Sequence, residues 1–334
     1  MMNTLIPLLI SFILFSPPDS TEPKSIFEAM HDHQEVLKVE LETDIKQLEA
    51  NIKTENYQPA TITFEDAEGN EQTWEMKIRP RGRFRRRVCT FPPVKINFNK
   101  SELKARNYKK HDELKLVTHC SNEKGSRENL LREYLAYQLY EVISPVYYRT
   151  QLLQIKYIDR ENRIRKKRFG ILLEDEKELA ARLDAELCED CYSQPESSFK
   201  KDNLRILSLF QYMIGNSDWS LAMLRNLKLL KDEETGKFYG APYDFDFSGL
   251  VDASYARPDQ TKGISNVRQR VFLGMAESDK ELEETIAHFQ SKRKAIMDTI
   301  DSFQLLSKSS RWDIKKYIEA FYEQLENGTI VEKK

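Results

Sequence analysis

The chain has 334 residues, of which 40% are hydrophobic and 10% aromatic, and its formal net charge is −2. The length fits two modest domains or one two-lobed domain, and the apolar content excludes wholesale disorder. The near balance of charge excludes a molecule that binds polyanions with its whole surface.

The chain opens with an apolar run at residues 5–15, followed by Ser16, Pro17 and Pro18. A run of this length is short for a membrane span and is typical of a secretory signal peptide. No Lys or Arg precedes it, and no clear small-x-small cleavage site follows. We expect residues 1–20 to be a signal peptide removed on export to a periplasm or the cell exterior, with an N-terminal membrane anchor as the alternative. No other long apolar segment follows, so we expect no transmembrane segment in the mature chain.

The first half of the chain predicts an antiparallel sheet with one helix. Residues 21–56 are charged with scattered apolar positions, a pattern that fits either a helix or a strand leading into a helix. From residue 60 the apolar period is two, which is typical of half-buried strands. The predicted strands cover residues 61–64, 74–78, 94–98, 114–117, 150–158 and 168–174, and the predicted helix covers 126–142.

The second half predicts mostly helix around a small hairpin. The predicted elements are a polar loop at 184–200, a helix at 203–214, a hairpin with strands at 226–230 and 237–243, and mostly helix after Tyr255. A sheet-rich half followed by a helical half predicts an α+β fold with two lobes.

The expected export affects how the four cysteines are interpreted. Cys89 and Cys120 lie beside predicted strands, and Cys188 and Cys191 form a Cys-x-x-Cys in the polar loop. In an oxidising compartment two disulfides are expected, with their pairing open. A zinc site that uses the four, with His119 as a further ligand, is a weaker alternative because a second close cysteine pair is missing. A redox-active dithiol is weaker still.

Two short segments flank the predicted hairpin and carry the polar residues of most interest. Asp218 ends a Gly-Asn-Ser-Asp run after the helix, Asn226 lies downstream, and Asp244 and Asp246 follow the second strand. Phosphoryl transfer needs one carboxylate to orient the attacking hydroxyl, and an amide with another carboxylate to hold Mg²⁺ against the phosphates. Taken singly, each residue is more simply a turn former. Their pairing across one hairpin favours a metal site.

These motifs, in this order of elements, resemble the protein-kinase-like fold. The similarity is closer to CotH-like secreted kinases and more distant to HipA-like kinases, and it covers about residues 35 to 300. The resemblance implies an antiparallel-sheet N-lobe with one helix at 21–175 and a mostly helical C-lobe with the catalytic hairpin at 176–334. It implies that Asp218 orients the acceptor and that Asn226 and Asp244 hold the metal. Asp246 is the alternative ligand, since it shares a side with Asp244 if the strand continues.

The resemblance also assigns the nucleotide side. Lys95 would reach the α and β phosphates, and Glu133 would pair with it from the helix. Glu133 is preferred over Glu128 because it lies beside the apolar face. Glu174 and Asp175 follow the last strand of the first half, where the backbone of the hinge usually reads adenine.

The sequence also departs from the family. No His-Arg precedes Asp218, and the gap from Asp218 to Asn226 is longer than in ordinary kinases. The glycine-rich loop is absent, and Gly82 stands alone in a run of six arginines at residues 79–87. Arg81 and Arg83 in this run are candidates to grip phosphates by bidentate hydrogen bonds.

The first functional hypothesis is an exported phosphotransferase that uses ATP or another nucleoside triphosphate with Mg²⁺ or Mn²⁺. Its acceptor is an unknown hydroxyl of a protein, a glycan or a small molecule. The second hypothesis is a pseudokinase-like protein that binds a nucleotide, an anion or a partner without turnover. The third is a polyanion binder that uses residues 79–87. No nucleic-acid partner is expected.

Overall fold

The computed structural model describes residues 22–31, 36–161, 165–274 and 279–330. The predicted signal peptide lies outside these ranges. The first part of the chain contains α1 (Ile26–His31), β1 (Leu37–Thr43), α2 (Ile45–Ala50), β2 (Gln58–Glu65), β3 (Glu71–Pro80), α3 (Arg85–Val88), β4 (Val94–Phe98), α4 (Lys100–Ala105), β5 (Glu113–Val117), α5 (Lys124–Ile143), β6 (Thr150–Asp159) and β7 (Arg165–Leu173). The second part contains α6 (Glu176–Arg182), β8 (Ala185–Cys188), η1 (Glu196–Ser198), α7 (Lys201–Met213), β9 (Leu227–Asp232), β10 (Phe238–Pro242), η2 (Gln260–Lys262), α8 (Asp279–Ser302) and α9 (Lys308–Glu326).

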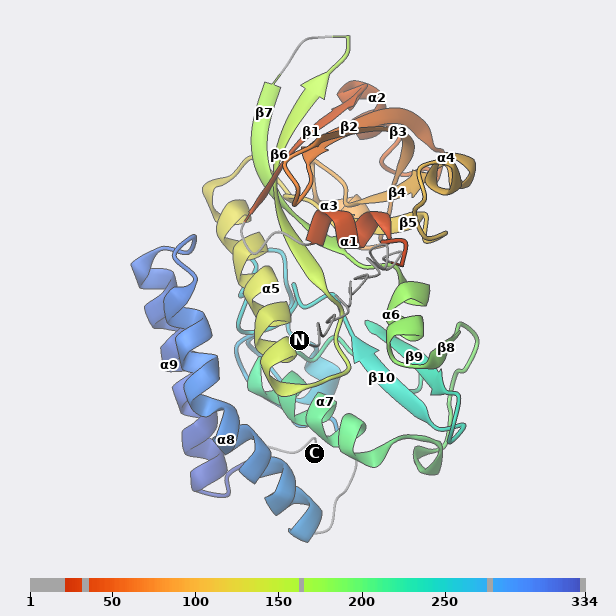
Figure 1. The fold of residues 1–334 in the computed structure, drawn as a ribbon. Helices are drawn as coiled ribbons and strands as arrows, with labels where there is room; N and C mark the ends of the chain where they lie inside the picture. Colours follow the sequence, from red (N-terminus) through yellow and green to blue (C-terminus); the bar gives the residue numbers. More distant parts are fainter. Residues whose placement is uncertain (1–21, 32–35, 162–164, 275–278, 331–334) are drawn as a thin grey trace, which may run out of the picture.

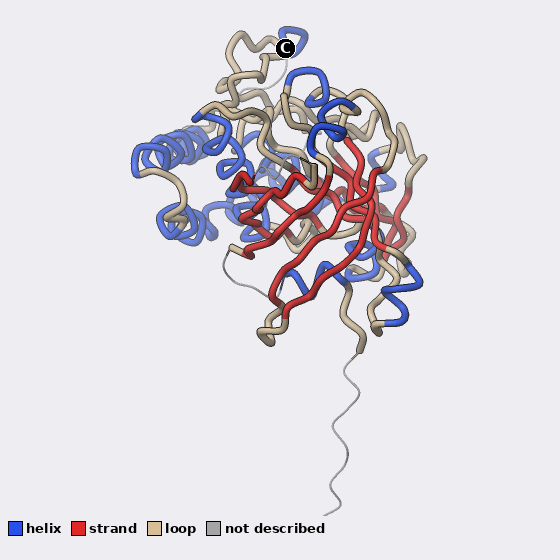
Figure 2. The backbone as a smooth tube through the Cα atoms, turned by 90° about the horizontal axis from the view of Figure 1, so that it is seen from above, coloured by secondary structure: helices blue, strands red, loops and turns tan. Residues whose placement is uncertain are grey.

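The α+β layout is confirmed, and the expected strands and the expected helix at 126–142 are present. The sheet, however, is a closed barrel in the order β1-β2-β3-β4-β5-β7-β6 (Figures 1 and 2). The strand β1 closes it by pairing in parallel with β6, from Leu37 opposite Leu153 to Thr43 opposite Asp159. The predicted strands pair antiparallel, as expected, whereas the parallel pairing of β1 and the closure of the sheet were not predicted. Strand β1 alternates buried and exposed residues, so its apolar side chains enter the barrel core.

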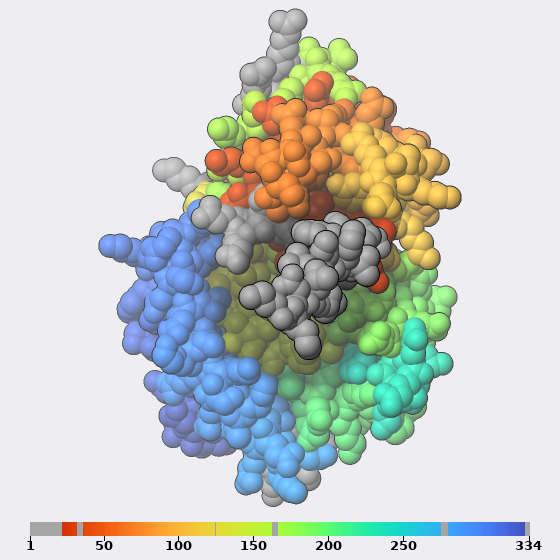
Figure 3. All heavy atoms as spheres, viewed as in Figure 1, coloured from red at the N-terminus to blue at the C-terminus, as the bar shows by residue number. Residues whose placement is uncertain are grey.

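A second core of buried side chains lies among α5, α7, α8 and α9. The ribbon and the space-filling view show α8 and α9, in blue, below and to the left of the barrel strands (Figures 1 and 3). Helix α5 runs between the barrel and the long helix α8. A three-stranded sheet in the order β10-β9-β8 extends the predicted hairpin by one strand. The mostly helical segment expected after Tyr255 is present as α8 and α9, but it begins later than expected, since between Tyr255 and α8 the described residues form only the three-residue η2.

The cysteines form the disulfides Cys89–Cys120 and Cys188–Cys191, which confirms two disulfides and settles their pairing. The zinc alternative is wrong because all four sulfurs are bonded in pairs, and the His119 ring instead stacks on Phe91 at 4.8 Å. Among the residues that the structure describes, no helix is both long and apolar enough to cross a membrane.

Candidate functional site

The two polar segments singled out in the sequence lie side by side. The backbone N–H of Gly249 donates to the carbonyl of Gly215 at 3.1 Å, and Tyr243 N–H donates to the carbonyl of Asn226 at 3.1 Å. Gly215 has φ +63°, and a Cβ there would lie 2.0 Å from the Tyr317 hydroxyl. A Cβ at Gly249 would lie 2.8 Å from the Cα of Arg268. Both glycines are therefore required by the close approach of the two loops to Tyr317 of α9 and to the backbone at Arg268.

Asp218 is held by its neighbours on both carboxylate oxygens. Its Oδ2 accepts a hydrogen bond from Asn226 Nδ2 at 3.0 Å, and its Oδ1 lies 3.4 Å from Arg225 Nη1. Its backbone N–H donates to Asn216 Oδ1 at 2.9 Å, which fixes the turn. Burial raises the pKa of Asp218 and Asp244 raises it further, while Arg225 and Asn226 act in the opposite direction. Asp218 is thus a half-buried, oriented carboxylate.

Asn226 and Asp244 both have left-handed backbones, with φ of +52° and +64°. Such strain in non-glycine residues persists only where the surroundings enforce it, and it concentrates at functional sites. Asp244 is fixed by its backbone N–H, which donates to the Tyr137 hydroxyl of α5 at 2.8 Å. The Nδ2 of Asn226 donates hydrogen bonds to the side-chain Oδ2 and to the backbone carbonyl of Asp218. Its Oδ1 has no hydrogen-bond partner within the described ranges.

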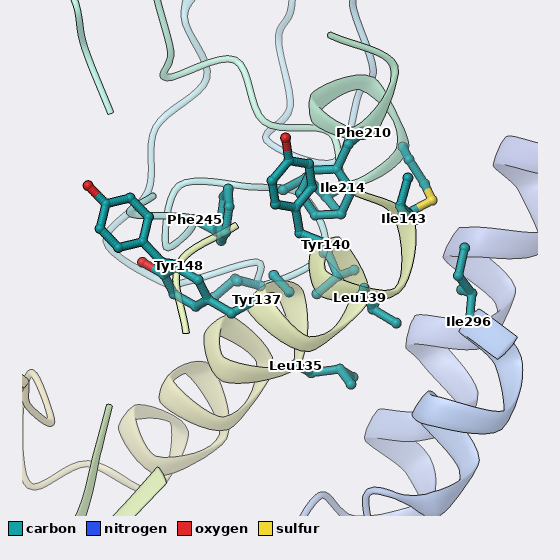
Figure 4. Close-up of a cluster of buried hydrophobic side chains, with 14 of the residues drawn as sticks. Leu135, Tyr137, Leu139, Tyr140, Ile143, Tyr148, Phe210, Ile214, Phe245 and Ile296 are labelled. Atoms are coloured by element: carbon teal, nitrogen blue, oxygen red, sulfur yellow. The ribbon is translucent and has the colours of Figure 1, made fainter. Parts of the chain in front are cut away.

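The left-handed turn at Asp244 ends the extended strand, so Asp244 and Asp246 do not share a side as a continuing strand would require. Asp244 is half-buried, whereas Asp246 is only 4% exposed and accepts a hydrogen bond from Tyr255 at 2.9 Å. Burial, and then the charge of Asp244, raise the pKa of Asp246 to about 7 against the opposing effects of Arg85 and Tyr255. Between them, Phe245 packs against the rings of Tyr137 and Phe210 (Figure 4).

The predicted pair between Lys95 and Glu133 is wrong. Glu133 is 1% exposed, and its carboxylate lies 3.7 Å from the guanidinium of Arg85 on α3. Lys95 instead pairs with Glu113 at 2.6 Å. The side chains next to Lys95 on β4 fill the barrel, so Lys95 itself must point outward, away from Glu133. Glu128, the rejected alternative, accepts a hydrogen bond from Ser307 Oγ at 2.9 Å.

Arg85 is the buried cation of the site. One Nη donates to the carbonyl of Thr118 at 2.6 Å while the other faces Glu133. Burial works against its charge, yet Tyr255, Glu133, Asp246 and Asp244 together raise the pKa of Arg85. Burial also raises the pKa of Glu133, with Asp246 as the next largest cause. An arginine from the basic run thus neutralises a group of buried acids.

Lys115 on β5 is a site residue that the sequence analysis missed. Its Nζ lies 4.8 Å from the centre of the Tyr243 ring and pairs with Glu176. Burial lowers the pKa of Lys115 to about 8, against the effect of Glu176. Lys115 stands directly opposite Lys95 across the β4–β5 ladder. The signal was present: Lys115 lies between two leucines on the strand immediately before α5.

The two arginines proposed as phosphate ligands differ in placement. The charge of Arg81 acts on Glu133, Tyr137 and Tyr243, which puts its half-buried side chain at the site. No ion pair of Arg81 is found within the part of the chain that the structure describes. Arg83 is exposed, and no contact in the described ranges ties it to the acidic group.

Glu174 and Asp175 lie between β7 and α6, where the hinge was predicted. The Glu174 carboxylate is fully buried and accepts hydrogen bonds from Arg149 Nε at 2.9 Å and Arg182 at 2.8 Å. Asp175 caps α6 by accepting a hydrogen bond from Lys177 N–H at 2.7 Å. Both residues line a cavity of about 1420 Å³ on the outer face of the barrel, together with Lys95 and Lys115. Their carboxylates are structural.

The described residues contain no group of three or more His, Cys, Asp or Glu arranged to hold a metal ion. The donor set of interest here is of another kind, an amide oxygen of Asn226 and a carboxylate of Asp244. Oxygen donors in this number, completed by water and phosphate, are what Mg²⁺ takes in nucleotide sites. The free Oδ1 of Asn226 and the half-buried Asp244 therefore fit such an ion.

No protein-family model matches this sequence, and no curated protein matches it. Among solved structures it is similar to the Helicobacter pylori proinflammatory kinase CtkA, at 12% sequence identity and a TM-score of 0.36. The similarity covers 70% of this chain and 90% of that chain. At this level it says nothing about the activity of this chain.

Proposed function

We propose that this protein is a kinase-like phosphotransferase that transfers a phosphoryl group from a nucleoside triphosphate to a hydroxyl. The observation that carries the proposal is the Asp218–Asn226 hydrogen bond, together with the backbone bond that brings Asp244 beside it. This arrangement couples an oriented carboxylate to two oxygen donors for a cation. It also supports the resemblance to CotH-like kinases with a two-lobed organisation.

The residues divide into two roles. Lys115 and Arg81 bind the nucleotide phosphates, and the cavity along β4, β5 and residues 174–176 takes the base and ribose. Asn226 Oδ1 and Asp244 hold Mg²⁺, which neutralises phosphate charge when bound. Asp246 is buried, accepts a hydrogen bond from Tyr255 and is subject to the charge of Arg85, and it remains the alternative ligand to Asp244.

Asp218 accepts the proton of the acceptor hydroxyl. As that proton moves to Asp218, the hydroxyl oxygen bonds to the γ-phosphorus, and the bond from this phosphorus to the β–γ bridging oxygen breaks. The nucleoside diphosphate leaves. The burial that raises the pKa of Asp218 favours this role, because a base works best with a pKa closer to the working pH.

Export is part of the proposal. Two disulfides suit an oxidising compartment rather than the cytoplasm. The basic run does not support the polyanion alternative, because it is not an unbroken basic surface. Arg85 is buried, Arg79 pairs with Glu55 at 3.3 Å, and Arg86 donates to the carbonyl of Thr54 at 3.0 Å.

The test is transfer of labelled γ-phosphate from ATP, with and without Mg²⁺, to water or to the protein itself. We expect Mg²⁺-dependent transfer that falls by about 100-fold or more in Asp218→Asn and Asp244→Asn, as for loss of a catalytic acid–base group. Asp301→Asn is the matched control, since Asp301 is exposed and pairs only with Lys315 among the described residues.

Transfer retained in both site variants would reject the assignment. A second candidate is nucleotide binding without turnover, favoured by the contact of Lys115 with Glu176, which occupies the lysine. Mg²⁺-dependent binding of ATP with no transfer selects that candidate.

A further inference from the structure

The residues between Asp218 and Asn226, which make this gap unusually long, fold into a closed loop. The backbones of Ser220 and Arg225 exchange two hydrogen bonds, at 3.2 and 3.0 Å, and Leu224 turns the chain with φ +48°. The carbonyl of Ala222 accepts a hydrogen bond from Ser193 N–H at 3.0 Å. The loop is therefore a fixed part of the site, and it places Arg225 against Asp218.

A second cavity, of about 780 Å³, lies against this loop. Its lining includes Trp219, Leu221, Arg225, Lys262, Phe272 and Glu196. The cavity shares none of its lining with the large cavity beside Lys115, so the loop that carries Asp218 has its own pocket. A volume of this size takes a compact small molecule.

The charges in this cavity are uneven. The Arg225 side chain is 52% exposed, and its Nη1 donates to Asp218 Oδ1. The Nε and the other Nη of Arg225 have no partner within the described ranges. Lys262 donates to the carbonyl of Ser217 and pairs with Asp259 at 3.5 Å. Asp259 is further occupied by Thr261, which leaves Glu196 as the only unpaired carboxylate of the described lining. The edge nearest Asp218 is thus cationic.

Arg225 links the cavity to the carboxylate of Asp218, which is not itself part of the lining. Asn226 donates to Oδ2 of Asp218, and Nη1 of Arg225 lies 3.4 Å from Oδ1. Each carboxylate oxygen can accept more than one hydrogen bond, so both remain open to an acceptor hydroxyl. An acid group on the acceptor would bind Nε and the second Nη of Arg225 in a bidentate manner, and this would place a hydroxyl of the same molecule beside Asp218.

We propose that the acceptor is a hydroxylated organic acid of about sugar size, a uronic acid being the simplest member. Its carboxylate binds Arg225 with Lys262 nearby, one hydroxyl meets Asp218, and Glu196 and Thr261 accept hydrogen bonds from other hydroxyls. Trp219 and Phe272 form apolar walls. This inference rests on the proposed phosphotransfer, and it names the class of molecule that the site receives.

The experiment measures labelled phosphate transfer from Mg²⁺–ATP to glucuronate and to glucose, which differ in the acid group. We expect transfer to glucuronate to be roughly tenfold faster or more, the effect of a charge-assisted hydrogen bond. Arg225→Gln should bring the ratio of the two rates close to one. Arg293→Gln replaces a half-exposed arginine that pairs with Glu326 between α8 and α9; it is the matched control and should keep the ratio.

Binding of glucuronate and glucose without nucleotide, followed by calorimetry, gives a second readout that does not depend on turnover. Tighter binding of glucuronate that Arg225→Gln abolishes supports the inference. Equal use of glucose, a preference that survives Arg225→Gln, or transfer to an acidic serine peptide in place of glucuronate would overturn it. ATP hydrolysis without such a preference rejects the acceptor alone, whereas no hydrolysis and no ATP binding rejects the proposed function as well.

Discussion

Two cation–carboxylate pairs in the first half of the chain differ in almost every physical respect. Arg85 and Glu133 are buried between α3 and α5, whereas Lys95 and Glu113 lie half-exposed on the outside of the barrel. The exposed pair is shorter, at 2.6 Å against 3.7 Å. Distance is a poor guide here, because exposed pairs contribute little and the loss of one member of a buried pair leaves a charge without solvent.

The largest expected effect is that of Arg85→Met. The substitution leaves the buried Glu133 and Asp246 without their cation, and breaking a buried pair in this way costs about 3–5 kcal/mol of stability. Denaturant unfolding measures the change. The double variant Arg85→Met/Glu133→Gln should recover part of the loss, and a single variant as stable as the wild type would contradict the neutralising role of Arg85.

The second largest effect is expected from removal of the Cys89–Cys120 disulfide, which anchors the end of the helix that carries Arg85. Cys89 follows α3 directly and is bonded to Cys120, 31 residues away, just before α5. Cys89→Ser/Cys120→Ser should cost about 2–4 kcal/mol, since closure of a longer loop removes more entropy from the unfolded chain. The pair Cys188→Ser/Cys191→Ser, with a separation of 3, is the matched comparison and should cost less. Equal losses in the two double variants would show that loop closure is not what separates them.

The dependence of protein stability on pH tests the burial of the acidic residue Asp246. The pKa of Asp246 is raised to about 7 in the folded protein, from about 3.9 in the unfolded chain. Between these values the folded state holds a proton that the unfolded state has lost, so this group's contribution to stability falls as pH rises from about 4 to about 7. Thermal unfolding of Asp246→Asn should show a flatter dependence over this range. An unchanged slope would place the titrating group elsewhere.

Lys115→Met and Lys95→Met compare the lysine of the site with its neighbour on the next strand. If Lys115 binds phosphate, its loss should weaken ATP binding by roughly 10- to 100-fold, the effect of a charge-assisted hydrogen bond. Lys95→Met should change stability by less than about 1 kcal/mol, as expected for an exposed pair. The reverse order of effects on ATP affinity would restore the role that the sequence pattern gave to Lys95.

The comparison also explains what the sequence was able to predict. The period of two in β2 to β5 and the apolar face of α5 arise from local burial, so these elements were visible in the chain. Gly215 and the Asp218–Asn226–Asp244 group were visible as motifs, because turns and metal ligands draw on few residue types.

The pairing of Arg85 with Glu133 and the position of Lys115 at the site could not be predicted from the sequence. They depend on the insertion of α3 over α5, and on the pairing of β5 with β4, which puts Lys115 on the same outer face as Lys95 and beside Tyr243. Each is a long-range event that no local pattern encodes. Asp246 was ambiguous for the same reason, since the left-handed turn at Asp244 is imposed by its contact with Tyr137.

The most direct measurement of the central claim is calorimetric titration with a non-hydrolysable ATP analogue, with and without Mg²⁺. Saturable binding that requires Mg²⁺, that Asp244→Asn abolishes and that Asp301→Asn preserves is the predicted result. Binding that is equally tight without Mg²⁺, or that Asp244→Asn leaves intact, would contradict a nucleotide–metal site built from Asn226 and Asp244.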